Sequence, residues 1–210
     1  MLAPSLLAIV AVMTATTTAT TDQAARGAEI DRALREDARA SRLWYTGWTT
    51  FYTVATAFSM KVAIDAESRD RRVGAAVDAV RSGLGLVTTV LFVPPSMTSR
   101  RLASDDVSGR ETWLQEAADA ERLGRSWLTH AANAAVNAAG GGYLWLHERR
   151  FVAGLVAFVS GTVIGEIKIW TQPTTALEAH RAANARSDVS LALSPMVSTT
   201  TAALVLDGRF

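Results

Sequence analysis

Apolar residues gather in four stretches of about twenty residues each, and most charged residues fall between them. These stretches are Leu43–Ile64, Val73–Pro95, Ser126–Leu146 and Phe151–Trp170. A helix needs about 20 largely apolar residues to cross the hydrocarbon core of a bilayer. The pattern therefore predicts an all-α membrane protein in which residues 43–170 form a four-helix transmembrane bundle.

The segments that precede the first span carry two different patterns. Residues 1–19 contain an apolar run, Leu6–Met13, followed by small residues and threonines, which predicts a secretory signal peptide. An uncleaved anchor is the alternative. Residues 22–42 alternate acidic and basic side chains at helical spacing, as in Asp31 and Arg35. They predict an exposed, charged amphipathic helix, with a partner-binding arm as the alternative.

The connection between the second and third spans is predicted to be partly helical. Pro94-Pro95 stops the second span, because proline cannot continue a helix. From Trp113 onward, apolar positions recur at a 3–4 spacing that passes Trp127 and enters the third span. We therefore expect one helix to lead from this outer loop directly into that span.

Residues 171–210 are expected to form an external tail. Thr175 followed by Glu178 has the spacing of a capping box and predicts a short helix. Alternating apolar residues in Ser190–Leu193 and Ala202–Phe210 then predict two short strands, a β-like end to the chain. Such an end is typical of closing strands in outer-membrane barrels. No series of alternating segments precedes it, so the outer membrane is the less favoured location.

Basic residues set the expected orientation. Lys61, Arg69, Arg71 and Arg72 lie at or after the end of the first span, and residues 149–150, both arginine, lie in the short turn after the third. An excess of Lys and Arg marks cytoplasmic loops. Both turns are therefore assigned to the inside, and the N-terminus lies outside after signal cleavage. The prediction is a multi-pass protein of a bacterial inner membrane.

Two charged residues in the second span form the first candidate cluster. Asp78 and Arg81 are three residues apart and share one helix face, so they are expected to form a structural ion pair. Arg81 can also extend toward the inner interface along its aliphatic stem. Pairing lowers the cost of placing ionisable groups among apolar helices.

The second cluster lies in the outer half of the bundle. His130, Asn133 and Asn137 share one face of the third span, and Glu166 has a depth in the fourth span that matches His130. These side chains are predicted to point into the bundle, because lipid contact would penalise them. Two interpretations stay open. They hydrogen-bond between helices as packing contacts, or they form an outward-opening polar pocket that binds a small polar group or relays a proton.

Small residues predict close packing of the fourth span. Ala153, Ala157, Gly161 and Gly165 recur every fourth residue. Such a stripe lets a neighbouring helix approach closely. The third and fourth spans are joined by a very short turn, so we expect them to be the neighbours that pack here.

Composition and motifs exclude several classes. The formal net charge of +1 leaves no basic stripe for nucleic acid, and the lack of Cys rules out disulfides and thiolate chemistry. His147-Glu148 begins like a zinc-protease helix, but Phe151 occupies the position of the second ligand, so no metal is predicted. No nucleophile elbow, phosphate loop or cofactor motif is found. An enzyme is therefore not favoured, and no cofactor is expected.

The expected function is a non-enzymatic bacterial envelope membrane protein that acts as a scaffold or accessory subunit. Its expected partners are the lipid bilayer and an envelope protein, with a homo-oligomer left open. The alternative is a small-molecule or lipid binder, or a carrier, that uses His130, Asn133, Asn137 and Glu166.

Overall fold

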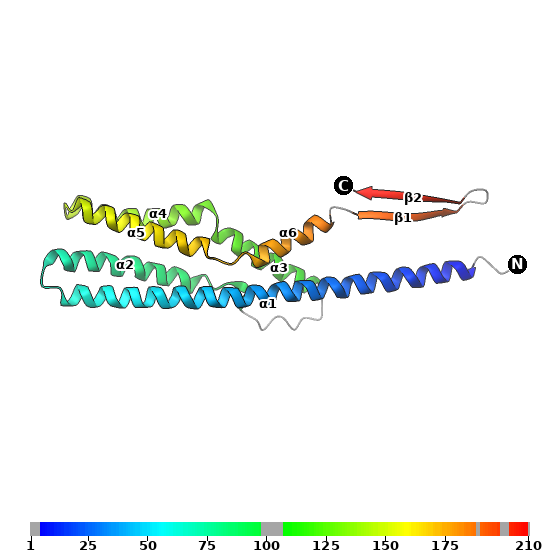
Figure 1. The fold of residues 1–210 in the computed structure, drawn as a ribbon, viewed down its shortest axis with the longest axis horizontal. Helices are drawn as coiled ribbons and strands as arrows, with labels where there is room; N and C mark the ends of the chain where they lie inside the picture. The colour runs from blue at the N-terminus through cyan, green and yellow to red at the C-terminus, as the bar shows by residue number, and fades with distance from the viewer. Residues whose placement is uncertain (1–4, 98–106, 188–189, 198–201, 210) are drawn as a thin grey trace.

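The chain folds into an elongated, predominantly helical molecule (Figure 1). The computed structural model describes residues 5–97, 107–187, 190–197 and 202–209, with side chains described for 23–97 and 109–185. The helices are α1 (Ser5–Asp65), α2 (Arg69–Leu91), η1 (Pro95–Met97), α3 (Val107–Gly124), α4 (Trp127–Gly142), η3 (Tyr143–His147, a π-helix), α5 (Phe151–Trp170) and α6 (Thr175–Ser187). The helices confirm the all-α class, and the only strands among the described residues form the terminal hairpin.

A short antiparallel hairpin follows α6. Its strands are β1 (Ser190–Val197) and β2 (Ala202–Arg209), and they pair in a register that sets Ser190 opposite Arg209 and Val197 opposite Ala202. They lie on the segments for which the sequence pattern predicts strands. Figure 1 places this hairpin at the same end of the molecule as the N-terminus.

The first helical hairpin consists of α1 and α2. Helix α1 continues without a break for 61 residues and includes the predicted signal segment from Ser5 onward. It ends at Asp65, and Ser68 then caps α2 by accepting a hydrogen bond from the Arg71 N–H at 3.3 Å. Helix α2 ends at Leu91, before Pro94, as the proline pair predicts.

The second helical hairpin consists of α4, η3 and α5. Its closest backbone approach is at Gly141 and Gly154, because a Cβ built on Gly141 would lie 2.6 Å from the Gly154 carbonyl oxygen. Within the predicted small-residue stripe, Ala157 and Gly165 are buried, whereas Ala153 and Gly161 are half-buried. Small residues do permit tight packing of α5 on α4, but the tightest point lies one residue beyond Ala153, outside the predicted stripe.

Helices α3 and α6 pack with residues 23–42 of α1 to form a small extension of the bundle, which we call the head. Its core joins all three helices and consists of Ile30, Leu34, Leu114, Ala117 and Ala176. The prediction of an exposed charged helix over 22–42 is therefore wrong for one face of that helix. The expected pair between Asp31 and Arg35 is replaced by a pair between helices, with Asp31 Oδ2 3.2 Å from Arg110 Nη1.

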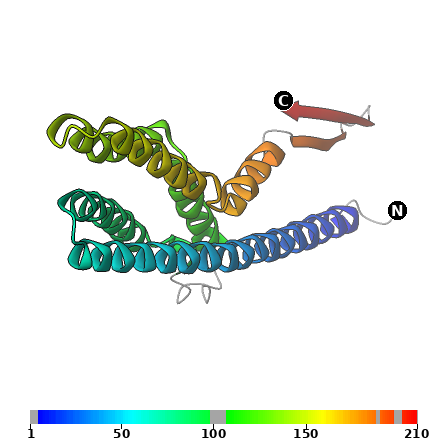
Figure 2. The ribbon, with the colours of Figure 1, turned by 60° about the vertical axis from the view of Figure 1, so that its left-hand side comes forward.

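The outer loop and the third span are separate helices, contrary to the prediction of one continuous helix. Helix α3 ends at Gly124, α4 begins at Trp127, and the two point in different directions (Figure 2). At the break the backbone of Ser126 is extended, with ψ 156°, and Arg125 Nη2 donates to the carbonyl oxygens of Trp170 at 2.7 Å and Gln172 at 2.6 Å. It thereby satisfies carbonyl groups at the C-terminal end of α5.

The predicted short helix is present as α6, but the predicted capping box of Thr175 and Glu178 is not formed. Thr174, rather than Thr175, precedes the helix, and its Oγ1 donates to Glu178 Oε1 at 2.7 Å. The Glu178 N–H also donates to the Thr174 carbonyl oxygen at 2.9 Å. The N–H groups of Ala176 and Leu177 in the first turn donate instead to the Glu121 carboxylate.

Two helices among the described residues, α2 and α5, are long and apolar enough to cross a membrane. The four predicted spans are thus supported only in part. Helix α4 has 16 residues, about 24 Å at 1.5 Å per residue, and it reaches a spanning length only together with η3. The first predicted span is the last third of α1 and contains Trp, Tyr and Thr residues that lower its mean hydropathy.

The turns of the two helical hairpins lie at the same end of the molecule, opposite the head (Figure 1). Arg69 Nη1 is 3.0 Å from Glu148 Oε2, and Arg150 Nε is 3.7 Å from Asp70 Oδ2. These contacts join the two basic turns that the sequence analysis assigns to one side of the membrane.

Candidate functional site

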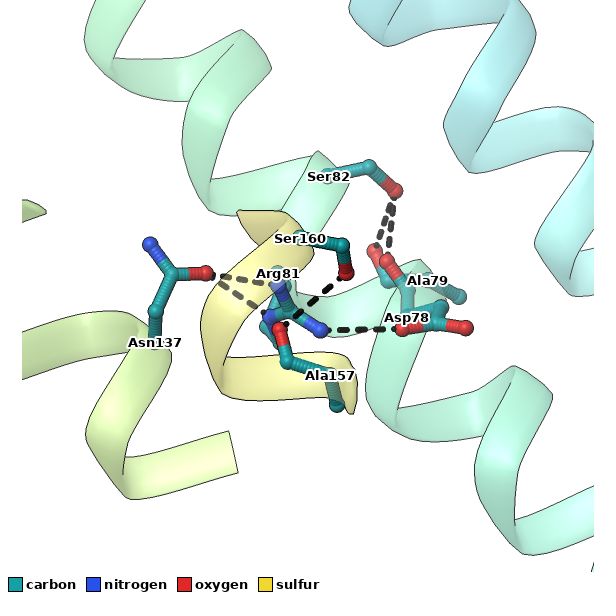
Figure 3. A network of polar contacts seen from close by, with 7 residues as sticks. All are labelled: Asp78, Ala79, Arg81, Ser82, Asn137, Ala157 and Ser160. Atoms are coloured by element: carbon teal, nitrogen blue, oxygen red, sulfur yellow. Dashed lines mark hydrogen bonds and ion pairs between the residues drawn. The ribbon is translucent and has the colours of Figure 1, made fainter. Parts of the chain in front are cut away.

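A chain of hydrogen-bonded side chains runs through the bundle from α2 to α4 and α5. It begins at Arg81, whose Nη1 lies 3.0 Å from Asp78 Oδ1 (Figure 3). The Arg81 side chain is only 11% exposed, whereas that of Asp78 is 57% exposed. The guanidinium is therefore drawn into the bundle and leaves its carboxylate partner near the surface.

Arg81 also binds Asn137, which connects the two helical hairpins. Its Nε and Nη2 donate to Asn137 Oδ1 at 3.0 and 2.7 Å (Figure 3). Asn137 is buried at 6% exposure. The sequence analysis treats Arg81 and Asn137 as members of separate clusters, and the structure brings them together. The sequence could have indicated this contact, because Asn137 lies deeper in the third predicted span than the other polar residues on the same helix face.

The two asparagines continue the chain along α4. Asn137 Nδ2 donates to Asn133 Oδ1 at 2.9 Å, and Asn133 Nδ2 donates to Glu166 Oε1 at 2.9 Å. Each amide therefore accepts on the side of Arg81 and donates on the side of Glu166. This orientation suits both ends, because a guanidinium only donates and a carboxylate only accepts.

The chain ends at a His–Glu pair in the half of the bundle nearest the head. His130 Nδ1 lies 2.6 Å from Glu166 Oε2, and the two side chains are 30% and 31% exposed. The His130 ring is 5.8 Å from the ring of Trp170. All four residues proposed as ligand-binding from the sequence, His130, Asn133, Asn137 and Glu166, thus lie in one connected network.

Glycines on α5 make room for this network. A Cβ on Gly161 would collide with Arg81 and Asn137, and a Cβ on Gly165 would collide with Asn133. These two glycines therefore accommodate polar side chains, whereas Gly141 and Gly154 provide the close approach of the backbones. The small-residue stripe has two physical uses, of which the sequence analysis identifies only the packing of helices.

A shallow hollow of about 410 Å³ lies against α5 beside Glu166. Its lining residues all belong to one face of α5 and its end: Thr162, Val163, Glu166, Ile167, Trp170 and Thr171. Val163 and Ile167 are about half exposed, and Trp170 is exposed. The hollow thus combines an apolar surface with one carboxylate.

Aromatic residues of α1 hold the end of α5 near this hollow. Trp44 Nε1 donates to the Lys168 carbonyl oxygen at 3.1 Å, and Trp48 Nε1 donates to Thr171 Oγ1 at 3.2 Å. The Lys168 ammonium donates to Thr89 Oγ1 at 2.7 Å and lies 5.2 Å from the centre of the Tyr52 ring. Hydrogen bonds and a cation–π contact therefore tie three helices together at this level.

A second buried polar cluster lies in the head and is absent from the sequence analysis. Asp37, Ser41 and Glu121 are between 1% and 5% exposed. Glu121 Oε2 accepts the Leu177 N–H at 2.7 Å at the start of α6. Burial and the neighbouring Asp37 carboxyl raise the pKa of Glu121 to about 8. Asp37 could have been found, because it follows Ile30 by seven residues and so shares its buried helix face.

The network places the Glu166 carboxylate, with its partners His130 and Asn133, beside the hollow. Within the described residues no group of three or more His, Cys, Asp or Glu side chains could hold a metal ion. Comparison with protein-family models, with curated proteins and with solved structures yields no match for this chain. The functional inference therefore depends on the contacts of this chain alone.

Proposed function

We propose that this protein spans a bacterial envelope membrane four times and acts there as a non-enzymatic scaffold or accessory subunit. The observation that carries the membrane assignment is the apolar outer surface of both helical hairpins. Large exposed apolar side chains on them include Val54, Phe58, Ile64, Val80, Val87, Leu91, Leu128, Val136, Val152, Val156 and Val163. Water would penalise such a surface, whereas lipid would not.

The pairing of the helices supports four spans rather than two. Helices α2 and α5 have the length and composition of spans, and each is antiparallel to a neighbour, α1 or α4, over much of its length. A membrane that contains α2 and α5 would therefore enclose these neighbours as well. The polar groups of the buried network bind one another, as groups inside a bilayer must.

The orientation follows from the two linked turns. Both carry arginines and lie at one end, which favours the cytoplasmic side of the inner membrane. The head, with its charged surface, would then face the outside and offer contacts to an envelope partner. This agrees with an exported N-terminus.

The absence of cysteine allows a direct test of this topology. We expect Glu116→Cys in the head to react with a membrane-impermeant maleimide in spheroplasts. Glu67→Cys in the turn after α1 should react only after permeabilisation, and Val87→Cys in α2 should stay unlabelled until detergent is added. All three residues are exposed in the isolated chain, so equal labelling of all three without detergent would contradict the proposal.

The scaffold role is tested by crosslinking from the head. A photoreactive residue at Glu116 or Arg181, both exposed, should form a discrete crosslink to one envelope protein in living cells. The same residue at Glu67, on the opposite side of the proposed membrane, is the control. Equal crosslinking from the two ends, or none from the head, would oppose a partner on the outside.

The alternative function is a small-molecule or lipid binder, which the hollow beside Glu166 favours. The two roles respond differently to His130→Ala, Asn133→Ala and Glu166→Ala made singly. A scaffold should lose stability but keep its crosslink, because these residues only join helices. A binder should lose function while its level in the membrane stays normal.

A further inference from the structure

We propose that the end of the molecule opposite the head binds anionic phospholipids of the cytoplasmic leaflet through three exposed arginines. These residues, which we call the arginine surface, are Arg71, Arg72 and Arg149. The group bound is the phosphate of a lipid whose headgroup has no opposing ammonium, such as phosphatidylglycerol. This inference rests on the proposed membrane location and orientation, because these bring the arginine surface to the level of the headgroups.

The arginine surface lies where the two helical hairpins turn (Figure 1). Arg71 and Arg72 are in the first turn of α2, and Arg149 is in the short turn between η3 and α5. Arg69 joins the two turns, because its Nη1 lies 3.0 Å from Glu148 Oε2 and its Nη2 donates to Glu148 Oε1 at 3.1 Å. The exposed arginines of both turns therefore belong to one surface.

The acidic residues at this end are mostly paired with other basic residues, so the arginine surface keeps a positive charge. Residues 61–72 and 147–150 contain six Lys and Arg side chains and four Asp and Glu side chains. Three of these acids form ion pairs outside the arginine surface: Asp65 with Lys61, Asp70 with Arg150, and Glu148 with Arg69. The fourth acid is the exposed Glu67, and the formal charge of the two segments is +2 with histidine neutral. A leaflet that contains anionic lipids attracts such a surface.

The guanidinium groups of this surface have hydrogen-bond donors to spare. Arg72 donates from Nη2 to the Ala66 carbonyl oxygen at 2.9 Å. Within residues 23–97 and 109–185, the side chains of Arg71 and Arg149 have no hydrogen-bond or ion-pair partner. A guanidinium carries five N–H donors, and its planar arrangement matches phosphate oxygens through paired, charge-assisted hydrogen bonds. Each arginine can therefore bind a lipid phosphate without giving up a contact within the described chain.

The backbone of Arg149 is strained, and no side-chain contact within the described part of the chain offsets the strain. Its φ is 55°, in the left-handed region, and no other non-glycine residue described by the structure has a positive φ. Arg149 follows Glu148, the C-cap of η3, at a position where glycine is common because it has no Cβ. The Arg150 N–H closes this turn by donating to the Leu144 carbonyl oxygen at 2.9 Å. A ligand of the Arg149 side chain would supply the missing compensation.

Exposed aromatic side chains place the arginine surface at the level of lipid headgroups. Trp145 in η3 and Phe151 at the start of α5 precede and follow Arg149 in the sequence, and their ring centres are 4.9 Å apart. The two residues are 51% and 49% exposed. Exposed Trp side chains gather at the boundary between hydrocarbon and headgroups. Arg149 would therefore lie beside the lipid phosphates.

The experiment measures which lipids the purified full chain retains. The chain is reconstituted in vesicles that contain equal amounts of phosphatidylglycerol, phosphatidylcholine and phosphatidylethanolamine with identical acyl chains. It is then extracted in mild detergent and weighed by native mass spectrometry. We expect phosphatidylglycerol to be retained about tenfold over the other two, because their ammonium groups oppose binding to arginine. Equal retention of the three lipids would overturn the proposal.

Arg149→Gly separates lipid binding from a structural role of Arg149. The preference for phosphatidylglycerol should fall about fivefold, which is the contribution of one arginine near an anionic membrane surface. The midpoint of thermal unfolding in detergent should stay the same or rise, because glycine adopts a positive φ without strain. Arg149→Lys keeps the charge and should keep most of the preference. Full preference in Arg149→Gly, or equal loss in both variants, would overturn the contact of Arg149 with lipid.

Arg71→Gln extends the test to α2. Combined with Arg149→Gly, it should bring retention of phosphatidylglycerol to within about twofold of phosphatidylcholine. The matched control is Arg181→Gln, which removes an exposed arginine of the head and should leave the preference unchanged. An equal loss in this control would show that any exposed arginine attracts the lipid, and it would overturn the assignment to the arginine surface.

Alkaline extraction of the vesicles distinguishes failure of this site from failure of the proposed function. A chain that leaves the vesicle pellet contradicts the membrane assignment, on which the site depends. A chain that stays in the pellet but retains the three lipids equally contradicts the arginine surface alone.

Discussion

The bundle and the head each bury polar side chains, but they offset the free-energy cost of desolvating those side chains in different ways. In the bundle, Arg81 and Glu166 are joined through two amides, so that a donor meets an acceptor at every step. In the head, Asp37 and Glu121 are two carboxyl groups, and the pKa of Glu121 rises to about 8. The head thus meets the cost of burial by binding a proton, which water can supply.

This difference teaches how solvent shapes the choice of polar residues. A proposed lipid environment offers no water to complete a partial network, so each group needs a fixed partner. The head is bounded by exposed charged helices, and proton uptake from water is an available solution there. Each of the following predictions perturbs one side of this comparison.

The largest effect is expected from Asn137→Leu in the bundle. The change removes the acceptor for two N–H groups of Arg81 and leaves a buried cation less well paired. We expect a loss of about 3 kcal/mol in unfolding free energy, measured by thermal unfolding in detergent. Asn184→Leu on the exposed face of α6 is the control and should cost little. If both variants lost the same unfolding free energy, the hydrogen-bonded network would contribute no more to stability than an exposed residue does.

The pH dependence of the head comes next. The Glu121 carboxyl has its pKa raised from 4.5 to about 8 in the folded protein, so the folded state binds more protons than the unfolded state between these values. The free energy of unfolding should therefore fall as pH rises through this window. At about 1.4 kcal/mol per pKa unit, we expect a loss of about 2 kcal/mol between pH 6 and 7.5.

Glu121→Gln isolates this contribution. The variant should be less sensitive to pH than the unmodified chain between pH 6 and 7.5, in parallel thermal unfolding measurements. Other titrating groups contribute to both proteins and cancel in the difference. An unchanged pH dependence in the variant would show that Glu121 is already ionised in the folded head throughout this window.

Gly161→Ala should have a smaller effect on the bundle. The added methyl group would collide with Arg81 and Asn137, and both side chains would have to shift from their hydrogen bonds. We expect a loss of about 1–2 kcal/mol, again from thermal unfolding in detergent. Gly142→Ala is the matched control, because a Cβ there meets no atom within 4 Å. It should be neutral or slightly stabilising.

The smallest effect is expected at the surface of the head. Arg26 Nε lies 2.6 Å from Glu111 Oε1, and the two side chains are 43% and 44% exposed. Arg26→Ala should therefore cost less than about 1 kcal/mol and should matter less at high salt. Thermal unfolding at low and high ionic strength measures both effects. A loss larger than that of Gly161→Ala would reverse the expected order.

Some elements could be predicted from the sequence because their ends carry local signals. Helix α5 runs from Phe151 to Trp170 as predicted, since short polar turns flank an apolar run. Helix α2 stops before Pro94 for the steric reason that proline supplies. The strands also fall on alternating segments. In each case the deciding information lies within a few residues.

Other features depend on contacts between distant segments. Residues 22–42 are mostly charged, so the narrow buried face that includes Ile30 and Leu34 is difficult to recognise in the sequence. Helices α3 and α6 cover this face, and they lie far away along the chain. The bond from Arg81 to Asn137 joins residues 56 positions apart. Helical spacing places each side chain on a face of its own helix, but it does not say which faces of different helices meet.

Helix α1 has a consequence for how the chain can change over time. One unbroken helix of 61 residues carries Asp37 and Ser41 into the head and Trp44 and Trp48 onto the end of α5. One residue inserted after Arg42 would rotate the two regions by about 100° around the helix axis. The number of residues between Ser41 and Trp44 is therefore fixed by the contacts on either side of this junction.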